Sequence, residues 1–201
     1  MEFLTGKTAD LHPAVVTGLA EYRHRVFVEQ LGWQLNCKEG LELDEFDHEG
    51  TLYVVARNGG GEVAGTARLL PTTQPYLLSE IFPNLLHGQP VPASSDIWEL
   101  SRFAAVDFDA QRSSPIGQFS SPVAVALLRA TLHAAAQRGA RWLITVSPLG
   151  VERLLRRAGF QAHRAGPPLI VDGQPIFACW IKVEADHHAE QIILKPGRNS
   201  Q

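Results

Sequence analysis

The segment SSPVAVALLRATLHAAAQRG constrains the fold more than any other stretch of the sequence. Ser120 and Ser121 suit the N-cap of a helix, Pro122 suits its first position, and Gly139 suits its end. Apolar runs typical of strands lie on either side, DIWELSRFAAV before the helix and ARWLITV after it. The sequence therefore predicts a strand, a helix and a strand in succession, as in an α/β fold.

Further elements are expected on both sides of this centre. Apolar residues at helical spacing predict a helix from Pro13 to Leu31 that ends at Gly32. The runs TLYVVARN and VAGTARLLP predict one hairpin, PLIVDGQPIFACWIKV predicts another, and PLGVERLLRRAG predicts a second helix after the central one. This order predicts an α/β sandwich in which helices flank a mixed and largely antiparallel sheet.

Composition limits the classes of partner that the chain can have. We expect one globular domain over residues 1–201, with a polar tail from about residue 186, because hydrophobic residues make up 45% of the chain. A net charge of −3 provides no general attraction for nucleic acid or for an anionic membrane. Cys37 and Cys179 lie in no metal-binding spacing and fit a reducing compartment. With no signal peptide and no apolar span, we expect a cytoplasmic protein.

The strand WELSRFAAV carries charged and hydroxyl side chains inside an apolar run. These are Glu99, Ser101 and Arg102, and Arg68 stands in a similar position in the preceding hairpin. A buried charge without a partner is costly, so each must be paired or must border a cavity. A structural ion-pair network, such as Glu99 with Arg68 or Arg102, explains this strand alone as well as a functional site does.

The N-terminal third contributes a second set of such residues. Arg23 and Phe27 are four residues apart, hence on one helical face, and Trp33 stands just beyond the helix end. The long loop that follows, WQLNCKEGLELDEFDHEG, carries Asp44 and Asp47, and long ordered loops are often functional. Taken singly, the aromatic residues suit a core and the acidic residues suit a solvated loop.

Together, these stretches resemble the acyl-homoserine lactone synthases, the autoinducer synthases of bacterial quorum sensing. The residues that match the family pattern, in chain order, are Arg23, Phe27, Trp33, Asp44, Asp47, Arg68, Glu99, Ser101 and Arg102. The resemblance continues into TVSPLGVERLLRRAGF and covers roughly residues 10 to 180. It implies an acetyltransferase-like α-β-α sandwich, in agreement with the order of elements above.

The resemblance also implies the reaction. The substrates are S-adenosylmethionine and an acyl chain carried as a thioester on acyl carrier protein, less often on coenzyme A; no metal and no separate cofactor is required. Glu99 is expected to be the general base for the amine, with Ser101 and Arg102 beside it in the catalytic motif. After N-acylation, the methionine carboxylate closes the lactone ring and expels methylthioadenosine.

The other matching residues are expected to bind substrate. Carboxylates complement the sulfonium and amino charges, arginines order carboxylates, and aromatic rings form walls for the adenosine and sulfonium. The carboxylates are Asp44 and Asp47, and the arginines are Arg23 and Arg68. The aromatic rings are those of Phe27, Trp33 and Phe103. Thr145 stands in the stretch WLITVSP, where family members that use 3-oxo-acyl chains carry a threonine.

The second predicted helix carries a basic cluster formed by Arg153, Arg156 and Arg157. Spacings of three and four residues place Arg153 beside the other two. Because acyl carrier protein is acidic, this cluster is a predicted docking patch. The alternative is a solvated helix face whose cations favour the helix C-terminus.

Other functions remain open at this point. An N-acetyltransferase of similar fold would use acetyl-coenzyme A, but QRSSPIGQFSSPV contains only Gly117 where those enzymes have a glycine-rich pyrophosphate loop. A non-catalytic module that binds S-adenosylmethionine is a further alternative, and the presence of Glu99 counts against it. A DNA-binding receptor is disfavoured, since the sequence has no helix-turn-helix segment or basic stripe.

Overall fold

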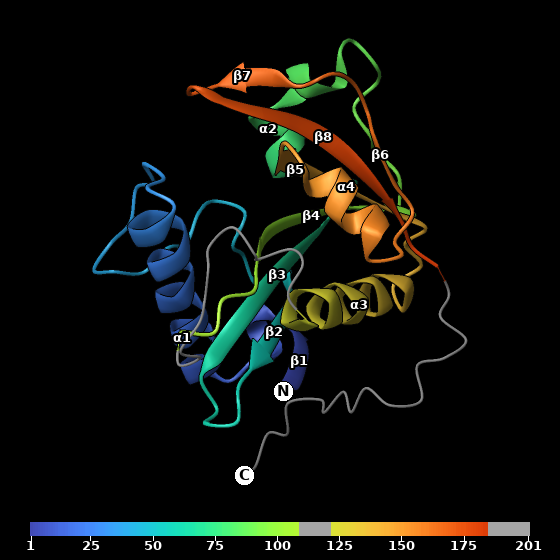
Figure 1. Cartoon of the computed structure of the whole chain (residues 1–201). Coiled ribbons are helices and arrows are strands. Elements are labelled where there is room, and N and C mark those ends of the chain that lie inside the picture. The colour runs from blue at the N-terminus through green and yellow to red at the C-terminus, as the bar shows by residue number, and fades with distance from the viewer. Residues whose placement is uncertain (109–121, 185–201) are drawn as a thin grey trace. The chain divides into compact units, whose positions relative to one another are not determined.

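The computed structural model describes residues 1–108 and 122–184 (Figure 1). The chain divides into two compact units, the first formed by Met1–Arg68 and Arg102–Thr131 and the second by Leu69–Ser101 and Leu132–His187. Three elements run along the chain from one unit into the other: β3 (Val63–Pro71), β4 (Ile97–Ala104) and α3 (Pro122–Ala136). A single domain over residues 1–201 therefore stays a prediction.

The first unit contains four neighbouring strands in the order β1-β2-β3-β4. Strand β1 (Glu2–Lys7) pairs antiparallel with β2 (Leu52–Arg57), and β2 and β3 form the predicted hairpin. Most positions of β2 and β3 are buried, as expected for strands covered on both faces. The sequence analysis missed β1, because this edge strand is half-buried along most of its length and shows no regular alternation.

The predicted N-terminal helix is confirmed, but it has two parts. Helix α1 (Pro13–Arg23) continues as the π-helix η2 (His24–Gln30). The wider turn is seen in the hydrogen bond from the Leu31 N–H to the Val26 carbonyl at 3.0 Å, five residues back. Gly32 follows with φ of 69° and ends the helix as predicted.

The core of the first unit forms between the N-terminal helix and the end of β4. Gly65 in β3 allows close packing, because a Cβ there would lie 3.0 Å from Leu127 Cδ2 of α3 and 3.2 Å from the Ala104 carbonyl oxygen. Any larger residue at this position would push the helix away from the strand. One buried cluster of this core is formed by Tyr22, Val26, Phe27, Ala104 and Val106.

The second unit contains strands in the order β3-β4-β5-β8-β6, and β7 also pairs with β8. Strand β5 (Trp142–Pro148) runs parallel to β4 and antiparallel to β8 (Gln174–Lys182). Strands β6 (Ala162–Arg164) and β7 (Leu169–Val171) pair antiparallel with β8. The predicted fold class, α/β with a mixed and largely antiparallel sheet, is confirmed.

The helices and turns of the second unit follow the predicted pattern in part. Helix α4 (Val151–Arg157) and the β7–β8 hairpin are confirmed, and Asp172 and Gly173 form the turn with φ of 49° and 75°. The sequence analysis missed β6 and the short helices, which offer too few residues for a periodic signal. These helices are η1 (Thr8–Asp10) in the first unit, and α2 (Leu77–Glu80) and η3 (Pro83–Leu86).

Some predictions concern residues that the structure does not describe. The N-caps at Ser120 and Ser121, the Gly117 loop and the tail from about residue 186 lie outside the described residues. Within the part that is described, helix α3 spans Pro122–Ala136, and Gly139 follows with φ of 80°, as predicted for the helix end. No helix in the described ranges has the length and apolar character needed to span a membrane.

Candidate active site

The acidic segment between η2 and β2 is folded by its own aspartates. The backbone N–H of Asp44 donates to Asp47 Oδ2 at 2.8 Å, and the N–H of Phe46 donates to Asp44 Oδ1 at 2.9 Å. Phe46 is buried beneath this turn, and its carbonyl accepts from the Thr51 hydroxyl at 2.7 Å. Short side chains that bond to nearby backbone therefore fix a turn with two carboxylates on it.

Asp47 lies at the centre of a buried ion-pair cluster in the first unit. Arg23 donates to both of its oxygens at 2.9 Å, and Arg68 Nη1 donates to Oδ1 at 2.9 Å. The Tyr53 hydroxyl also donates to this carboxylate. Burial opposes ionisation, but the two guanidinium groups outweigh it and hold the pKa of Asp47 well below its usual range.

Glu42 is a cluster member that the sequence analysis missed. Its side chain is buried between two arginines: Arg23 Nε donates to Oε2 at 2.5 Å, and Arg102 Nε and Nη2 donate to Oε1 at 3.1 and 3.0 Å. Burial opposes its ionisation, and the arginines lower its pKa. A charge count could not have found it, because the predicted arginines Arg23, Arg68 and Arg102 were already equal in number to the predicted carboxylates Asp44, Asp47 and Glu99.

Asp44 bridges two arginines of the cluster, Arg68 and Arg102. Arg68 Nη1 donates to Asp44 Oδ1 at 2.5 Å, and Arg102 Nη2 donates to Oδ2 at 2.7 Å. Arg102 has φ of 49°, a left-handed conformation that is unusual for a residue other than glycine and costs about 1–3 kcal/mol. The two carboxylates that bind its guanidinium hold this residue in place.

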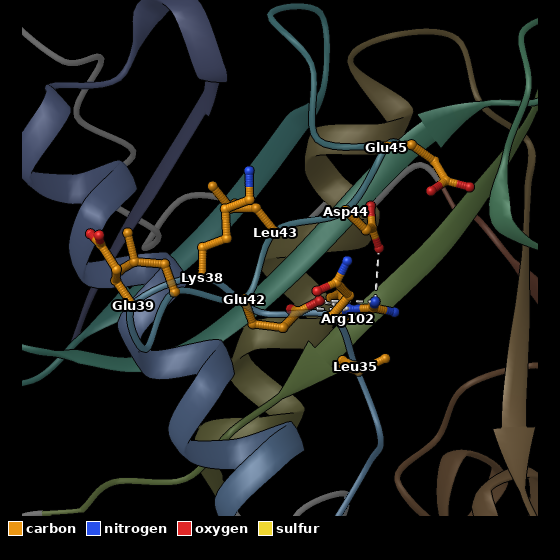
Figure 2. Close-up of a pocket in the computed structure, with 10 residues that line it drawn as sticks. Leu35, Lys38, Glu39, Glu42, Leu43, Asp44, Glu45 and Arg102 are labelled. Atoms are coloured by element: carbon orange, nitrogen blue, oxygen red, sulfur yellow. Dashed lines mark hydrogen bonds and ion pairs between the residues drawn. The ribbon is translucent and has the colours of Figure 1, made fainter.

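A pocket of about 710 Å³ opens beside this cluster (Figure 2). Figure 2 shows Glu42, Asp44 and Arg102 together on its wall, with Arg102 bonded to both carboxylates. Carboxylates outnumber cations around the pocket, so it suits a ligand with positive charge. The lining residues are Leu35, Asn36, Lys38, Glu39, Leu41, Glu42, Leu43, Asp44, Glu45 and Arg102.

Two predicted aromatic residues lie close to the same arginine. The rings of Phe27 and Trp33 are stacked, with centroids 4.8 Å apart and an interplanar angle of 21°. The guanidinium carbon of Arg102 lies 5.7 Å from the Phe27 ring and 5.9 Å from the Trp33 ring. Phe27 is buried, whereas Trp33 is 44% exposed and can contact a ligand. The N–H of Trp33 donates to the Phe27 carbonyl at 2.9 Å, so the π-helical turn sets this pair.

The second unit holds the predicted base on β4. Glu99 is 1% exposed, and its two carboxylate oxygens accept the backbone N–H groups of Leu77 at 3.1 Å and Leu78 at 2.7 Å. These N–H groups begin α2, so the carboxylate is fixed in orientation by backbone. The β4–β5 register is parallel over three pairs and ends at Glu99 and Ile144, which leaves Ser101 and Thr145 just beyond the last pair.

The structure thus brings together most of the predicted residues within the first unit. Those that share the cluster or touch it are Arg23, Phe27, Trp33, Asp44, Asp47, Arg68 and Arg102. Phe103 is a half-buried residue in the same unit, and its role stays a prediction. Glu99, Ser101 and Thr145 belong to the second unit, where all three are buried.

The predicted docking arginines lie on α4 in the second unit. Arg153, Arg156 and Arg157 are all exposed, and the side chain of Arg156 is 67% exposed, with Nη1 3.6 Å from Glu152 Oε1. Glu152 also accepts from Arg164 Nε at 2.8 Å. A second pocket, of about 450 Å³, lies beside Arg156 and is lined by Trp142, Arg156, Gly159, Phe160, Gln161, Ala162 and His163.

Comparison with known proteins identifies the family. A family model described as autoinducer synthase matches residues 9–192. The acyl-homoserine-lactone synthase of Acinetobacter nosocomialis is 53% identical over 183 residues, which cover 91% of this chain and 100% of the relative. The synthase of Ralstonia solanacearum is 48% identical over 87% of this chain and 85% of the relative.

Solved structures agree with this assignment. The structure of TofI in a ternary complex with an inhibitor and MTA has a TM-score of 0.79 and 42% identity over 98% of both chains. A structure of BjaI, a coenzyme-A-dependent acyl-homoserine lactone synthase with S-adenosylmethionine and isopentyl-CoA, has a TM-score of 0.79 and 26% identity over 92% of this chain and 84% of that one. The chain therefore belongs to the autoinducer synthase family, and it is an acyltransferase that makes a quorum-sensing signal of the acyl-homoserine-lactone type.

Proposed function

We propose that the chain makes an N-acyl-homoserine lactone from S-adenosylmethionine and an acyl thioester on acyl carrier protein, and that it releases methylthioadenosine. The observation that carries this proposal is the pocket beside the ion-pair cluster, which has Asp44 and Arg102 on its wall. The substrate carries a sulfonium, an ammonium and a carboxylate, and this wall offers both signs of charge. The MTA and S-adenosylmethionine named in the TofI and BjaI structures support this substrate class.

The cluster residues divide into those that face the ligand and those that hold the wall. Asp44 lines the pocket and its side chain is 19% exposed, so it meets the cationic groups of the substrate. Arg23 and Asp47 are buried and bonded to each other, so they act through the residues that they fix. Trp33 provides the exposed aromatic face for the adenosine or sulfonium.

Glu99 acts as the general base in the first chemical step. It accepts a proton from the ammonium, and the neutral amine then attacks the thioester carbonyl carbon. The carbon–sulfur bond of the thioester breaks, and the leaving thiolate takes the second amine proton as the amide forms. Backbone N–H groups close to Ser101, just beyond the last β4–β5 pair, are suited to stabilise the oxyanion of this step.

Ring closure completes the reaction without a further reactant. A carboxylate oxygen of the acylated methionine moiety attacks its own γ-carbon, and the bond from that carbon to the sulfonium breaks. The lactone forms and methylthioadenosine leaves as a neutral thioether. Arg102, which lines the pocket, orders the charged groups for this intramolecular attack, and the buried Arg68 acts through Asp44, which it binds. The attack needs the reacting atoms to be held close together.

The identity of the acyl donor rests on the exposed arginines of α4. Three exposed cations on one short helix provide a surface for an acidic carrier protein, and coenzyme A would need only a small anion site. Thr145, which is buried on β5 just beyond the last β4–β5 pair, is proposed to contact the acyl chain near its 3-position. The coenzyme-A dependence named for BjaI makes the donor the point to test.

The test is a donor comparison with purified protein. The enzyme is given S-adenosylmethionine with medium-chain acyl carrier protein or with the matching acyl-coenzyme A, and lactone and methylthioadenosine are measured by mass spectrometry. We expect both products in equal amounts, with the carrier protein as the better donor. Equal or better turnover with acyl-coenzyme A would overturn the donor assignment, and folded protein that yields no lactone from any donor would overturn the whole proposal.

A further inference from the structure

Arg102 leaves one nitrogen of its guanidinium group, Nη1, available to a ligand. A guanidinium has five N–H donors. In Arg102 the Nε donor and both Nη2 donors point to Glu42 and Asp44, at 2.7 to 3.2 Å. Among the residues that the structure describes, Nη1 has no hydrogen-bond partner, although Arg102 lines the pocket. Its two N–H groups are therefore available for an acceptor that enters the pocket.

Glu42 is held so rigidly that it can set the direction of these donors. It is 1% exposed, and Arg23 Nε donates to its Oε2 at 2.5 Å from the side opposite Arg102. Arg23 is itself fully buried and is fixed by both oxygens of Asp47. The carboxylate of Glu42 accepts from both Nε and Nη2 of Arg102. Two such hydrogen bonds along one edge orient a guanidinium more strongly than a single bond does.

Other contacts do not fix this direction as well. Asp44 accepts one bond from Arg102, and its side chain is 19% exposed, against 2% for Glu42. The backbone of Arg102 is in the left-handed region, so it favours return to an extended conformation if the side chain is released. The carboxylate of Glu42 is thus the main restraint on where Nη1 points.

We propose that Glu42 is a positioning residue that aims Arg102 Nη1 at the carboxylate of the amino-acid part of the substrate. This inference rests on the proposed function, because it takes S-adenosylmethionine as the ligand of this pocket. A carboxylate needs strong donors here, since the charged residues on the remaining pocket wall are one cation, Lys38, and three carboxylates, Glu39, Asp44 and Glu45. Two N–H groups from one guanidinium nitrogen provide them, while Glu42 compensates the charge of Arg102.

The test compares two ligands that differ in the part that Arg102 is proposed to bind. Methylthioadenosine lacks the amino-acid carboxylate, whereas S-adenosylmethionine carries it. Both are titrated calorimetrically into the wild-type protein, Glu42→Gln and the control Glu49→Gln, which changes an exposed carboxylate in the same loop. We expect Glu42→Gln to weaken S-adenosylmethionine binding at least about tenfold and methylthioadenosine binding less than about twofold, and the control to change neither.

A double-mutant cycle shows whether Glu42 acts through Arg102. Arg102→Gln alone should weaken S-adenosylmethionine binding, and adding Glu42→Gln should then cost little more. The inference would be overturned if the loss of S-adenosylmethionine affinity in the double variant equalled the product of the two single losses. It would also be overturned if Glu42→Gln weakened the binding of both ligands equally. If Glu42→Gln does not fold, Glu42→Asp keeps the charge but shortens the reach, and the same ligand preference decides. If the wild-type protein binds neither ligand, the proposed function fails instead.

Discussion

The first and second units use arginines in opposite ways. In the first unit, Arg23 and Arg68 are fully buried, and each bonds to carboxylates of the acidic segment. On α4 of the second unit, Arg153, Arg156 and Arg157 are exposed, and Arg156 forms an ion pair with Glu152 that spans 3.6 Å. The same type of side chain is a fixed part of a buried ion-pair cluster in one place and a solvated charge in the other.

This difference separates two kinds of functional effect. A buried, paired charge cannot be removed without stranding its partner, so it acts on stability and on the geometry of the reacting groups. An exposed charge is screened by salt and acts mainly on the rate of encounter with a partner. Substitutions in the buried set should therefore change turnover or folding, and those on α4 should change only the handling of the acyl donor.

The largest effect is expected at Glu99, the buried carboxylate on β4. Glu99→Gln keeps the shape but removes proton acceptance, so turnover should fall roughly 10²–10⁴-fold while S-adenosylmethionine still binds. Steady-state rates and calorimetric titration measure the two quantities. Raising the pH should partly restore the rate, because it deprotonates the substrate amine directly.

A structural role for Glu99 gives a different result. Its oxygens accept from the N–H groups of Leu77 and Leu78, and an amide could accept from only one side. If this anchoring of α2 were its only role, Glu99→Gln would lower the unfolding temperature and show no rescue at high pH. That combination would count against Glu99 as the base.

The next effect in size is the loss of Asp47 from the buried cluster. Asp47→Ala leaves Arg23 and Arg68 without their shared acceptor, and we expect a loss of about 3–5 kcal/mol in the free energy of unfolding. Asp10→Ala, at an exposed aspartate of the same unit, should change it by less than about 0.5 kcal/mol. Urea unfolding of the two variants measures the difference, and a loss for Asp47→Ala as small as that of the control would show that the cluster contributes little to folding.

Acid should weaken the first unit through the same carboxylates. The pKa values of Asp47 and Glu42 are lower in the folded chain than their ordinary values, so their stabilisation is complete above about pH 5 and is lost as the pH falls further. Unfolding in urea at pH 7, 5 and 3 should show this decline. Asp47→Asn should be less stable at pH 7 and should decline less; an unchanged decline in this variant would contradict the assignment.

The smallest effect should come from the exposed arginines. Reversing the charge of Arg153, Arg156 and Arg157 should raise the KM for acyl carrier protein several-fold in low salt and leave the KM for S-adenosylmethionine nearly unchanged. The effect should weaken with added salt. Equal damage to the kinetics of both substrates would instead point to a structural role for α4.

Much of the fold could be predicted because its main elements are long and periodic. Helix α3, the β2–β3 hairpin and β5 each carry a clear apolar pattern with turn residues at their ends. The short elements α2 and β6 could not be predicted, since each has fewer than five residues and depends on tertiary contacts for its stability. The π-helical turn at His24–Gln30 has no sequence signature of its own.

The candidate site shows the same division. A resemblance carried by Arg23, Asp44 and Glu99 named most of its residues, because the motif keeps their types and order. It did not supply Glu42, whose role depends on its burial between two arginines. Nor did strand alternation predict the left-handed backbone of Arg102, which its ion pairs stabilise.

A crystal structure of the protein with S-adenosylmethionine bound tests the central claim most directly. We expect density in the pocket walled by Glu42, Asp44 and Arg102, with the sulfonium near Asp44 and the carboxylate within hydrogen-bond distance of Arg102 Nη1. Ligand bound elsewhere, for example in the pocket of Trp142 and His163, would contradict the account. So would a ligand in the expected pocket whose carboxylate points away from Arg102.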